Sequence, residues 1–209
     1  MRVNDIVNGL DKMYPNPVCE LNFNKDYELV LSTMLSAQTT DKRVNMVMGP
    51  IYEEYNSLEK LNELNVSEIS SLISSIGLYK NKAVYFKKIV ESLISYDKVP
   101  NNREFLESIP GLGRKSANVI LSVLYNEPYI GVDTHVTRVS KRLDIANKED
   151  DVHIIEKKLY SFFKDFDYKK IGQQLVLFGR YTCLSKKPKC HECLLYKECN
   201  HVDKIKKDI

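Results

Sequence analysis

Residues 109–118 read IPGLGRKSAN, and this stretch decides which fold the chain adopts. Helical patterns precede and follow it, and Gly111 and Gly113 permit the positive φ angles of a tight turn between two helices. The helix after the turn has one apolar stripe, formed by Ala117, Ile120, Leu121 and Leu124. The pattern therefore predicts a hairpin turn and its following helix at residues 109–125.

The start of the helix after the turn is suited to phosphate binding. Its first N–H groups have no partner inside the helix and point toward the turn. Contacts of this kind hold a duplex in place without reading its sequence. Gly111, Gly113 and Arg114 are therefore candidate DNA-binding residues. A Gly-x-Gly turn also joins helices in proteins that bind no nucleic acid, so the turn alone leaves both interpretations open.

Lys115 lies in the first turn of the same helix, about 170° from the middle of the apolar stripe. A cation is disfavoured at that end of a helix, because the helix dipole is positive there. A solvated lysine is the ordinary interpretation of any single lysine. The unfavourable position nevertheless suggests that this amine has another use.

Most of the remaining chain also has helical periodicity. Apolar residues recur at i, i+3, i+4 and i+7 along 3–10, 44–55, 69–76, 83–94, 152–163 and 169–178. We expect Gly77 to take the left-handed conformation that often ends a helix. No stretch alternates long enough for a strand, so we predict an all-α fold.

The composition is that of a globular protein of one large domain or two small ones, with 209 residues, 43% hydrophobic and 28% charged. No apolar run approaches the roughly 20 residues that span a bilayer. The first residues lack the continuous apolar stretch of a signal peptide, so we expect a cytoplasmic protein. The net charge, 31 − 28 = +3, is weak support for a nucleic-acid partner.

Four of the five cysteines fall close together, and only Cys19 lies apart from them. The cluster consists of Cys183, Cys190, Cys193 and Cys199. Four soft ligands with short spacers fit either tetrahedral zinc or a [4Fe–4S] cube, and spacing does not separate the two. Disulfides would be the alternative in an oxidising compartment.

Five segments of the chain resemble the endonuclease III family, a bacterial branch of the helix-hairpin-helix DNA glycosylases. They are LSAQ at 35–38, IGLY at 76–79, IPGLGRKSAN at 109–118, VDTH at 132–135 and GRYTC at 179–183. They follow the family's order and span almost the whole chain. Ser116 replaces a threonine common in the family, and it keeps the hydroxyl group.

The resemblance implies a bifunctional DNA glycosylase and AP lyase of base excision repair, associated with the nucleoid. Its partner would be double-stranded DNA with damaged bases or abasic sites, bound by a monomer. Lys115 would be the catalytic amine and Asp133 the essential carboxylate. From spacing alone Asp133 is a helix N-cap, and both roles can hold together. The four clustered cysteines would hold a [4Fe–4S] cluster.

The resemblance also implies specific DNA contacts. Gln38 would fill the gap left by the everted base, Leu78 would wedge into the duplex, and His135 would contact phosphate or the surroundings of the lesion. The loop before the second clustered cysteine would face phosphates with Lys186, Lys187 and Lys189. Without the family, Gln38 is a polar loop residue, Leu78 a core leucine and His135 a surface histidine.

The implied architecture has two helical lobes with a DNA-binding cleft between them. Residues 19–127 would form a helical barrel, and residues 1–18 with 128–209 the iron–sulfur lobe. Only a neutral amine can attack, and a nearby carboxylate raises the pKa of a lysine, so we expect no tight ion pair between Lys115 and Asp133.

Oxidised pyrimidines are the substrate class that the resemblance implies, and two alternatives stay open. One is another glycosylase of the superfamily, specific for mismatches or adenine, although adenine-removing relatives lack the hairpin lysine. The other is a non-catalytic iron–sulfur protein that binds DNA.

Overall fold

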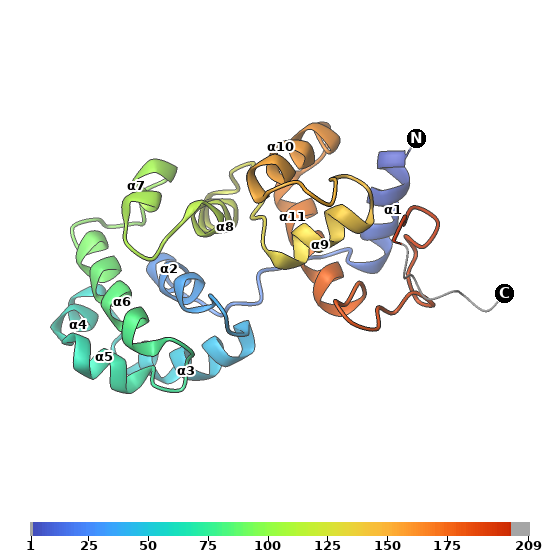
Figure 1. The fold of residues 1–209 in the computed structure, drawn as a ribbon. Helices are drawn as coiled ribbons and strands as arrows, with labels where there is room; N and C mark the ends of the chain where they lie inside the picture. Colours follow the sequence, from blue (N-terminus) through green and yellow to red (C-terminus); the bar gives the residue numbers. More distant parts are fainter. Residues whose placement is uncertain (1, 202–209) are drawn as a thin grey trace. The chain divides into compact units, whose positions relative to one another are not determined.

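The computed structural model describes residues 2–201, and the regular structure in that range is entirely helical (Figure 1). This confirms the all-α prediction. The helices are α1 (Arg2–Met13), α2 (Asp26–Leu35), α3 (Asp41–Glu54), α4 (Leu58–Glu63), α5 (Val66–Leu72), α6 (Tyr79–Leu93), α7 (Arg103–Ser108), α8 (Arg114–Tyr125), α9 (Thr134–Arg142), α10 (Val152–Phe162) and α11 (Tyr168–Tyr181). None of these helices is long and apolar enough to cross a membrane.

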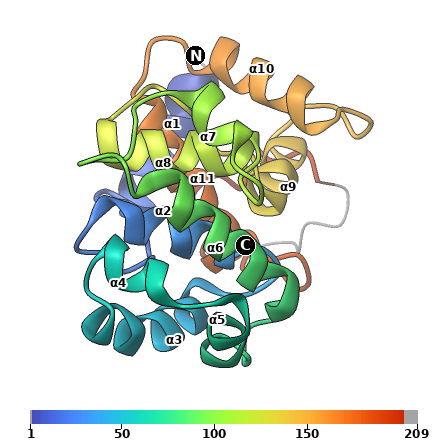
Figure 2. The same cartoon turned by 90° about the vertical axis from the view of Figure 1, so that its left-hand side faces the viewer.

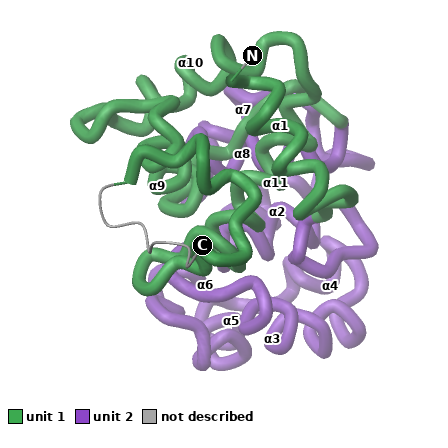
Figure 3. The backbone as a smooth tube through the Cα atoms, turned by 90° about the vertical axis from the view of Figure 1, so that its right-hand side faces the viewer, with its two compact units in different colours: residues 1–18, 126–209 green, residues 19–125 purple. Residues whose placement is uncertain are grey.

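The chain divides into two compact units, coloured separately in Figure 3. Unit 1 combines Met1–Val18 with Asn126–Ile209, and unit 2 is the continuous stretch Cys19–Tyr125. Unit 2 thus contains α2 to α8, whereas unit 1 brings α1 together with α9, α10 and α11.

Unit 2 is built around α2, which packs against α3, α6 and α8 (Figure 2). The side chains of α2 are buried from Tyr27 to Leu35, because neighbouring helices cover it on several sides. Such a helix needs apolar residues around most of its circumference rather than along one stripe. The hairpin is attached to this centre, since α8 contacts both α2 and α7.

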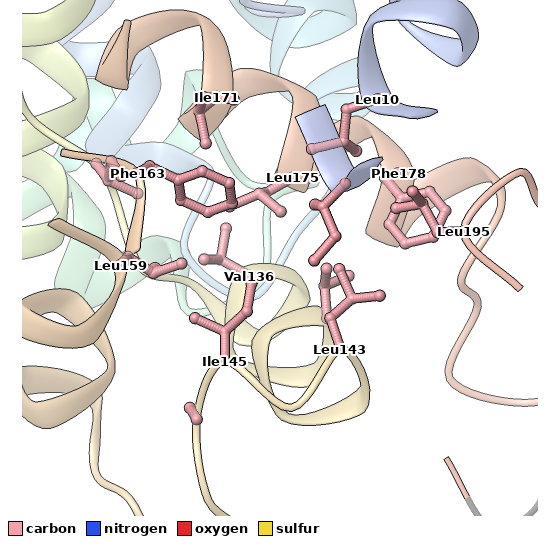
Figure 4. Packing of buried hydrophobic residues seen from close by; sticks show 14 of the residues in the cluster. Leu10, Val136, Leu143, Ile145, Leu159, Phe163, Ile171, Leu175, Phe178 and Leu195 are labelled. Carbon is pink, nitrogen blue, oxygen red and sulfur yellow. The ribbon is translucent and has the colours of Figure 1, made fainter. Parts of the chain in front are cut away.

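Unit 1 has its own core, in which side chains from α1, α9, α10 and α11 meet (Figure 4). Leu10 of α1 and Phe178 of α11 are almost completely buried in it, together with Phe163. Leu195, which lies between Cys193 and Cys199, also packs into this core. The segment that carries the clustered cysteines is therefore anchored to unit 1 by apolar contacts.

The structure corrects one sequence expectation, which concerns the turn before α6. Helix α5 ends at Leu72, and Gly77 does not take the left-handed conformation. Leu78 takes it instead, with φ 62°. Left-handed backbone at a leucine is strained, and such positions persist only where the surrounding structure holds them.

An ion pair links α1 to α11 within unit 1, and its removal gives a testable prediction. Asp11 Oδ1 accepts hydrogen bonds from Lys170 Nζ at 2.7 Å and from Gln174 Nε2 at 2.8 Å. These bonds lower the pKa of Asp11, so its contribution to stability is present at neutral pH and is lost as the pH falls through that lowered value.

We expect Asp11→Asn to lower the free energy of unfolding by on the order of 0.5–1 kcal/mol at pH 7. The difference from the unchanged protein should begin to shrink as the pH falls below the ordinary pKa of an aspartate, toward the lowered pKa of Asp11. Urea unfolding between pH 7 and pH 3 measures this. Asp165→Asn, at an exposed aspartate of the same unit, is the control. A deficit of equal size at every pH would refute the prediction.

Candidate active site

The hairpin has the predicted form, and Gly111 is its critical residue. Gly111 has φ +95°, and the N–H of Leu112 donates to the carbonyl oxygen of Ile109 at 3.0 Å to close the turn. A Cβ on Gly111 would lie 2.7 Å from Cβ of Tyr85 in α6, so this glycine also permits close packing. A Cβ on Gly113 would meet no atom within 4 Å, so that part of the turn is open.

Lys115 lies half-buried in the first turn of α8, beside the open part of the hairpin. The opposite face of the helix is buried through Ala117, Ile120 and Leu121, as the sequence predicts. Within the described part of unit 2, no carboxylate pairs with Lys115. The amine is therefore placed beside the hairpin turn without a counter-ion in the described part of unit 2.

Asp133 is the N-cap of α9 in unit 1. Its Oδ1 accepts a hydrogen bond from the N–H of Val136 at 2.8 Å. The N-cap interpretation is therefore confirmed. The carboxylate is half-buried, and among residues 2–201 its second oxygen has no hydrogen-bond partner. Capping thus orients the group and leaves one oxygen available for chemistry.

His135 follows in the first turn of the same helix, and Arg138 sets its orientation. Nη2 of Arg138 lies 3.2 Å from Nδ1 of His135 and 2.7 Å from the carbonyl oxygen of Gly179. Because a guanidinium can only donate, Nδ1 must accept, and a neutral His135 carries its proton on Nε2. The half-buried ring thereby presents an N–H donor, which suits a phosphate oxygen.

Gln38 and Leu78 occupy two neighbouring loops of unit 2. Both side chains are exposed, Leu78 by 57%, so the alternative that Leu78 is a core leucine is wrong. Both residues have left-handed backbone, with φ 58° at Gln38 and 62° at Leu78. A Cβ on Gly77 would lie 3.9 Å from the carbonyl oxygen of Gln38, which shows how closely the loops approach.

The four clustered cysteines line one pocket in unit 1. Arg142 binds their first loop, because its Nη1 donates to the carbonyl oxygen of Leu184 at 2.7 Å and lies 3.3 Å from Sγ of Cys183. Burial raises the pKa of Cys183, and it raises that of Cys193 to about 11. Among residues 2–201, no three His, Cys, Asp or Glu side chains are grouped so that they could hold one metal ion.

The loop between Cys183 and Cys190 carries three exposed lysines. They are Lys186, Lys187 and Lys189. The N–H of Lys189 donates to the carbonyl oxygen of Thr182 at 2.9 Å, so the loop is closed at its base. A closed loop presents its cations at fixed positions, as a phosphate-binding surface requires.

Sequence reasoning missed the parts that Arg138, Arg142 and Lys82 play in this architecture. The two arginines lie one helical turn apart on α9, and that spacing was the available signal. Lys82 lies one turn before the buried Phe86, and a lysine at that position of an apolar stripe was the corresponding signal.

Comparison with known proteins identifies the class. The family described as HhH-GPD superfamily base excision DNA repair protein matches residues 31–165. The chain belongs to this family, as the quoted motifs predicted.

Particular relatives lie within that class. The protein named endonuclease III of Bacillus subtilis strain 168 is 40% identical over 200 residues, covering 93% of this chain and 91% of the relative. Endonuclease III of Escherichia coli K12 is 36% identical over 203 residues, covering 96% of both chains.

Solved structures agree with the sequence relatives. A non-covalent endonuclease III–DNA complex superposes with a TM-score of 0.90 at 36% identity, covering 95% of this chain and 94% of that one. A trapped covalent endonuclease III–DNA intermediate superposes with a TM-score of 0.88 at 37% identity, covering 95% of both chains.

Proposed function

We propose that the protein is a bifunctional DNA glycosylase and AP lyase of base excision repair that removes oxidised pyrimidines from double-stranded DNA. The observation that carries this proposal is Lys115, an amine without a local counter-ion in the first turn of the helix after the hairpin. Family membership and nearly full-length similarity to endonuclease III support the same activity. A role on the chromosome places the protein at the nucleoid.

The amine of Lys115 attacks C1′ of an everted nucleotide. The bond from C1′ to the base breaks, and the base leaves with the bonding electrons and takes up a proton. The amine then gives up one proton, the C1′–O4′ bond breaks as the sugar ring opens, and O4′ takes up that proton. The nitrogen lone pair forms the second bond to C1′, which gives a protonated Schiff base between Nζ and C1′. The iminium acidifies the hydrogen on C2′, and removal of that proton expels the 3′ phosphate by β-elimination.

Asp133 stabilises the positive charge that develops on the sugar as the base departs. Its Oδ1 is used for the α9 cap, and the second oxygen serves the reaction. The hydrogen bond from Val136 therefore fixes the orientation of the carboxylate, while its second oxygen stays available for the reaction. Proton relay from the attacking amine is the second task that an ionised carboxylate can perform here.

The hairpin amides and Arg114 hold the phosphate backbone. Gln38 fills the space of the everted base and Leu78 intercalates beside it. Nε2 of His135 donates to phosphate. The residues of unit 2 form the helical barrel domain, and those of unit 1 the iron–sulfur domain. Binding should weaken steeply with salt, because the lysines of the cysteine loop neutralise phosphates.

The clustered cysteines fit a [4Fe–4S] group. Their four thiols surround one pocket, and soft thiolates are its usual ligands. Four thiolates also suit a zinc ion, and the choice of the cube rests on the similarity to the endonuclease III family. The cluster would supply cross-links that hold the lysine loop closed.

Cys193→Ser is therefore expected to lose most of the bound iron and sulfide. Serine is nearly isosteric but lacks the soft sulfur ligand, so the purified variant should hold far fewer than the roughly four irons of the unchanged protein. Iron and sulfide analysis measures this. Cys19→Ser, in unit 2, is the matched control and should keep the full content. Zinc without sulfide in the unchanged protein would contradict the assignment.

The function is tested with duplexes that contain thymine glycol, an abasic site or a mismatched adenine. Borohydride reduces the Schiff base and links the protein covalently to DNA. We expect adducts and strand cleavage with the first two duplexes and none with mismatched adenine. Activity on adenine alone would favour the adenine-removing relatives, and binding without any adduct would favour a non-catalytic protein.

A further inference from the structure

A buried lysine that the proposed chemistry does not use connects the loops of Gln38 and Leu78. Lys82 lies in the first turn of α6, and it is only 4% exposed. Its Nζ donates to the carbonyl oxygen of Leu35 at 2.8 Å and to that of Ala37 at 2.6 Å. Leu35 is the last residue of α2, and Ala37 lies in the turn after it, directly before Gln38.

These carbonyls need a donor, because the last carbonyl groups of a helix have no partner within it. A cation there also interacts favourably with the negative end of the helix dipole. Burial lowers the pKa of Lys82, and within the described chain no carboxylate compensates its charge. An apolar side chain would avoid this desolvation but would leave both carbonyls without the ammonium donor.

The same residue is bound to the Leu78 loop through its backbone. The N–H of Lys82 donates to the carbonyl oxygen of Leu78 at 3.0 Å. The side chain of Lys82 thus contacts the chain immediately before Gln38, and its backbone N–H contacts the peptide of Leu78. The strained left-handed backbone at Gln38 and at Leu78 lies on either side of this link.

We propose that Lys82 is a positioning residue, which holds Gln38 and Leu78 at a fixed separation so that both enter the duplex in one step. The inference rests on the proposed function, in which these two side chains replace the everted nucleotide. Side chains that are ordered before binding lose less entropy when they insert. Lys82 itself touches neither DNA nor the reacting atoms.

The test is a double-mutant cycle with the rate of borohydride trapping on an abasic duplex as readout. Lys82→Met keeps an unbranched side chain one atom shorter and removes its donors. We expect trapping to slow about tenfold or more, since small misplacements carry large rate penalties. Gln38→Ala combined with Leu78→Ala should be at least as slow. Adding Lys82→Met to that pair should slow trapping by less than about twofold further.

Each other outcome has a definite meaning. If Lys82→Met slows trapping in the Gln38 and Leu78 variant by the same factor as in the unchanged protein, the proposal is overturned. A normal trapping rate in Lys82→Met alone would also overturn it. A normal rate in the Gln38 and Leu78 variant would overturn it as well, because their insertion would not matter. If the unchanged protein forms no adduct, that result contradicts the proposed enzymatic function rather than the positioning role of Lys82.

A matched control comes from the same helix. Lys87 also donates to a neighbouring element, with Nζ 3.0 Å from Oδ1 of Asn62 in α4. Lys87→Met removes a comparable link away from Gln38 and Leu78, and its trapping rate should stay within about twofold of normal. Should Lys82→Met fail to fold, Lys82→Gln, which keeps one N–H donor, replaces it in the same cycle with the same criteria.

Discussion

Lys115→Ala is expected to abolish the borohydride-trapped adduct and to slow strand cleavage at an abasic site by about a thousandfold or more. Alanine has no amine, so no Schiff base can form, and loss of a covalent nucleophile is among the most costly changes in an active site. The variant should still bind duplex DNA, because the hairpin amides remain. Denaturing gels after reduction measure the adduct, and fluorescence anisotropy measures binding.

Folding should be almost unaffected by this change. Lys115 is half-buried and has no ion pair within the described part of unit 2, so its loss should shift the free energy of unfolding by less than about 0.5 kcal/mol. Lys60→Ala, at an exposed lysine of α4, controls for the lost charge and should trap normally. An adduct that persists in Lys115→Ala would show that another amine is the nucleophile.

Gly111→Ala is the change with the second largest expected effect, and it acts on the fold of the hairpin. Left-handed backbone costs an alanine roughly 1–2 kcal/mol. The added Cβ would also lie 2.7 Å from Cβ of Tyr85, and overpacking of that kind costs roughly 1–3 kcal/mol. We expect a total loss of about 2–5 kcal/mol and a fall of roughly 10 °C in Tm.

Gly113→Ala is the matched control for this prediction. Its Cβ would meet no atom within 4 Å and its φ is not left-handed, so we expect a loss below about 1 kcal/mol. Calorimetry of the two variants measures the contrast. Tyr85→Gly removes both Cβ and the ring, so adding Gly111→Ala to Tyr85→Gly should cost only the backbone conformation and not the steric part. Equal stability of the two glycine variants would refute the steric account.

The helices were predictable because their apolar spacing is a local property of the chain. The hairpin was predictable as well, since Gly111 satisfies both a backbone angle and a close approach that no other residue permits. The position of the left-handed residue before α6 was not predictable from the sequence. Gly77 was the obvious candidate, and Leu78 takes that conformation because the tertiary structure holds it there.

The supporting contacts depend on residues far apart in the chain, and for that reason local patterns did not reveal them. Arg138 donates to the carbonyl oxygen of Cys183, 45 residues later, and Lys82 reaches back 47 residues to Leu35. A lysine or arginine is ordinarily solvated, so its residue type predicts the surface. The catalytic interpretation of Lys115 came from motif resemblance, which spacing alone did not supply.

The discontinuous composition of unit 1 has a consequence for synthesis on the ribosome. Helix α1 is made first, yet its core partner α11 begins 155 residues after α1 ends. At about 5–20 residues per second, Ile6 and Leu10 stay without that partner for roughly 8–30 s, while the whole of unit 2 emerges and can fold. The nascent chain thus exposes the apolar stripe of α1 until α11 has been made, which makes that stripe a natural target for chaperones.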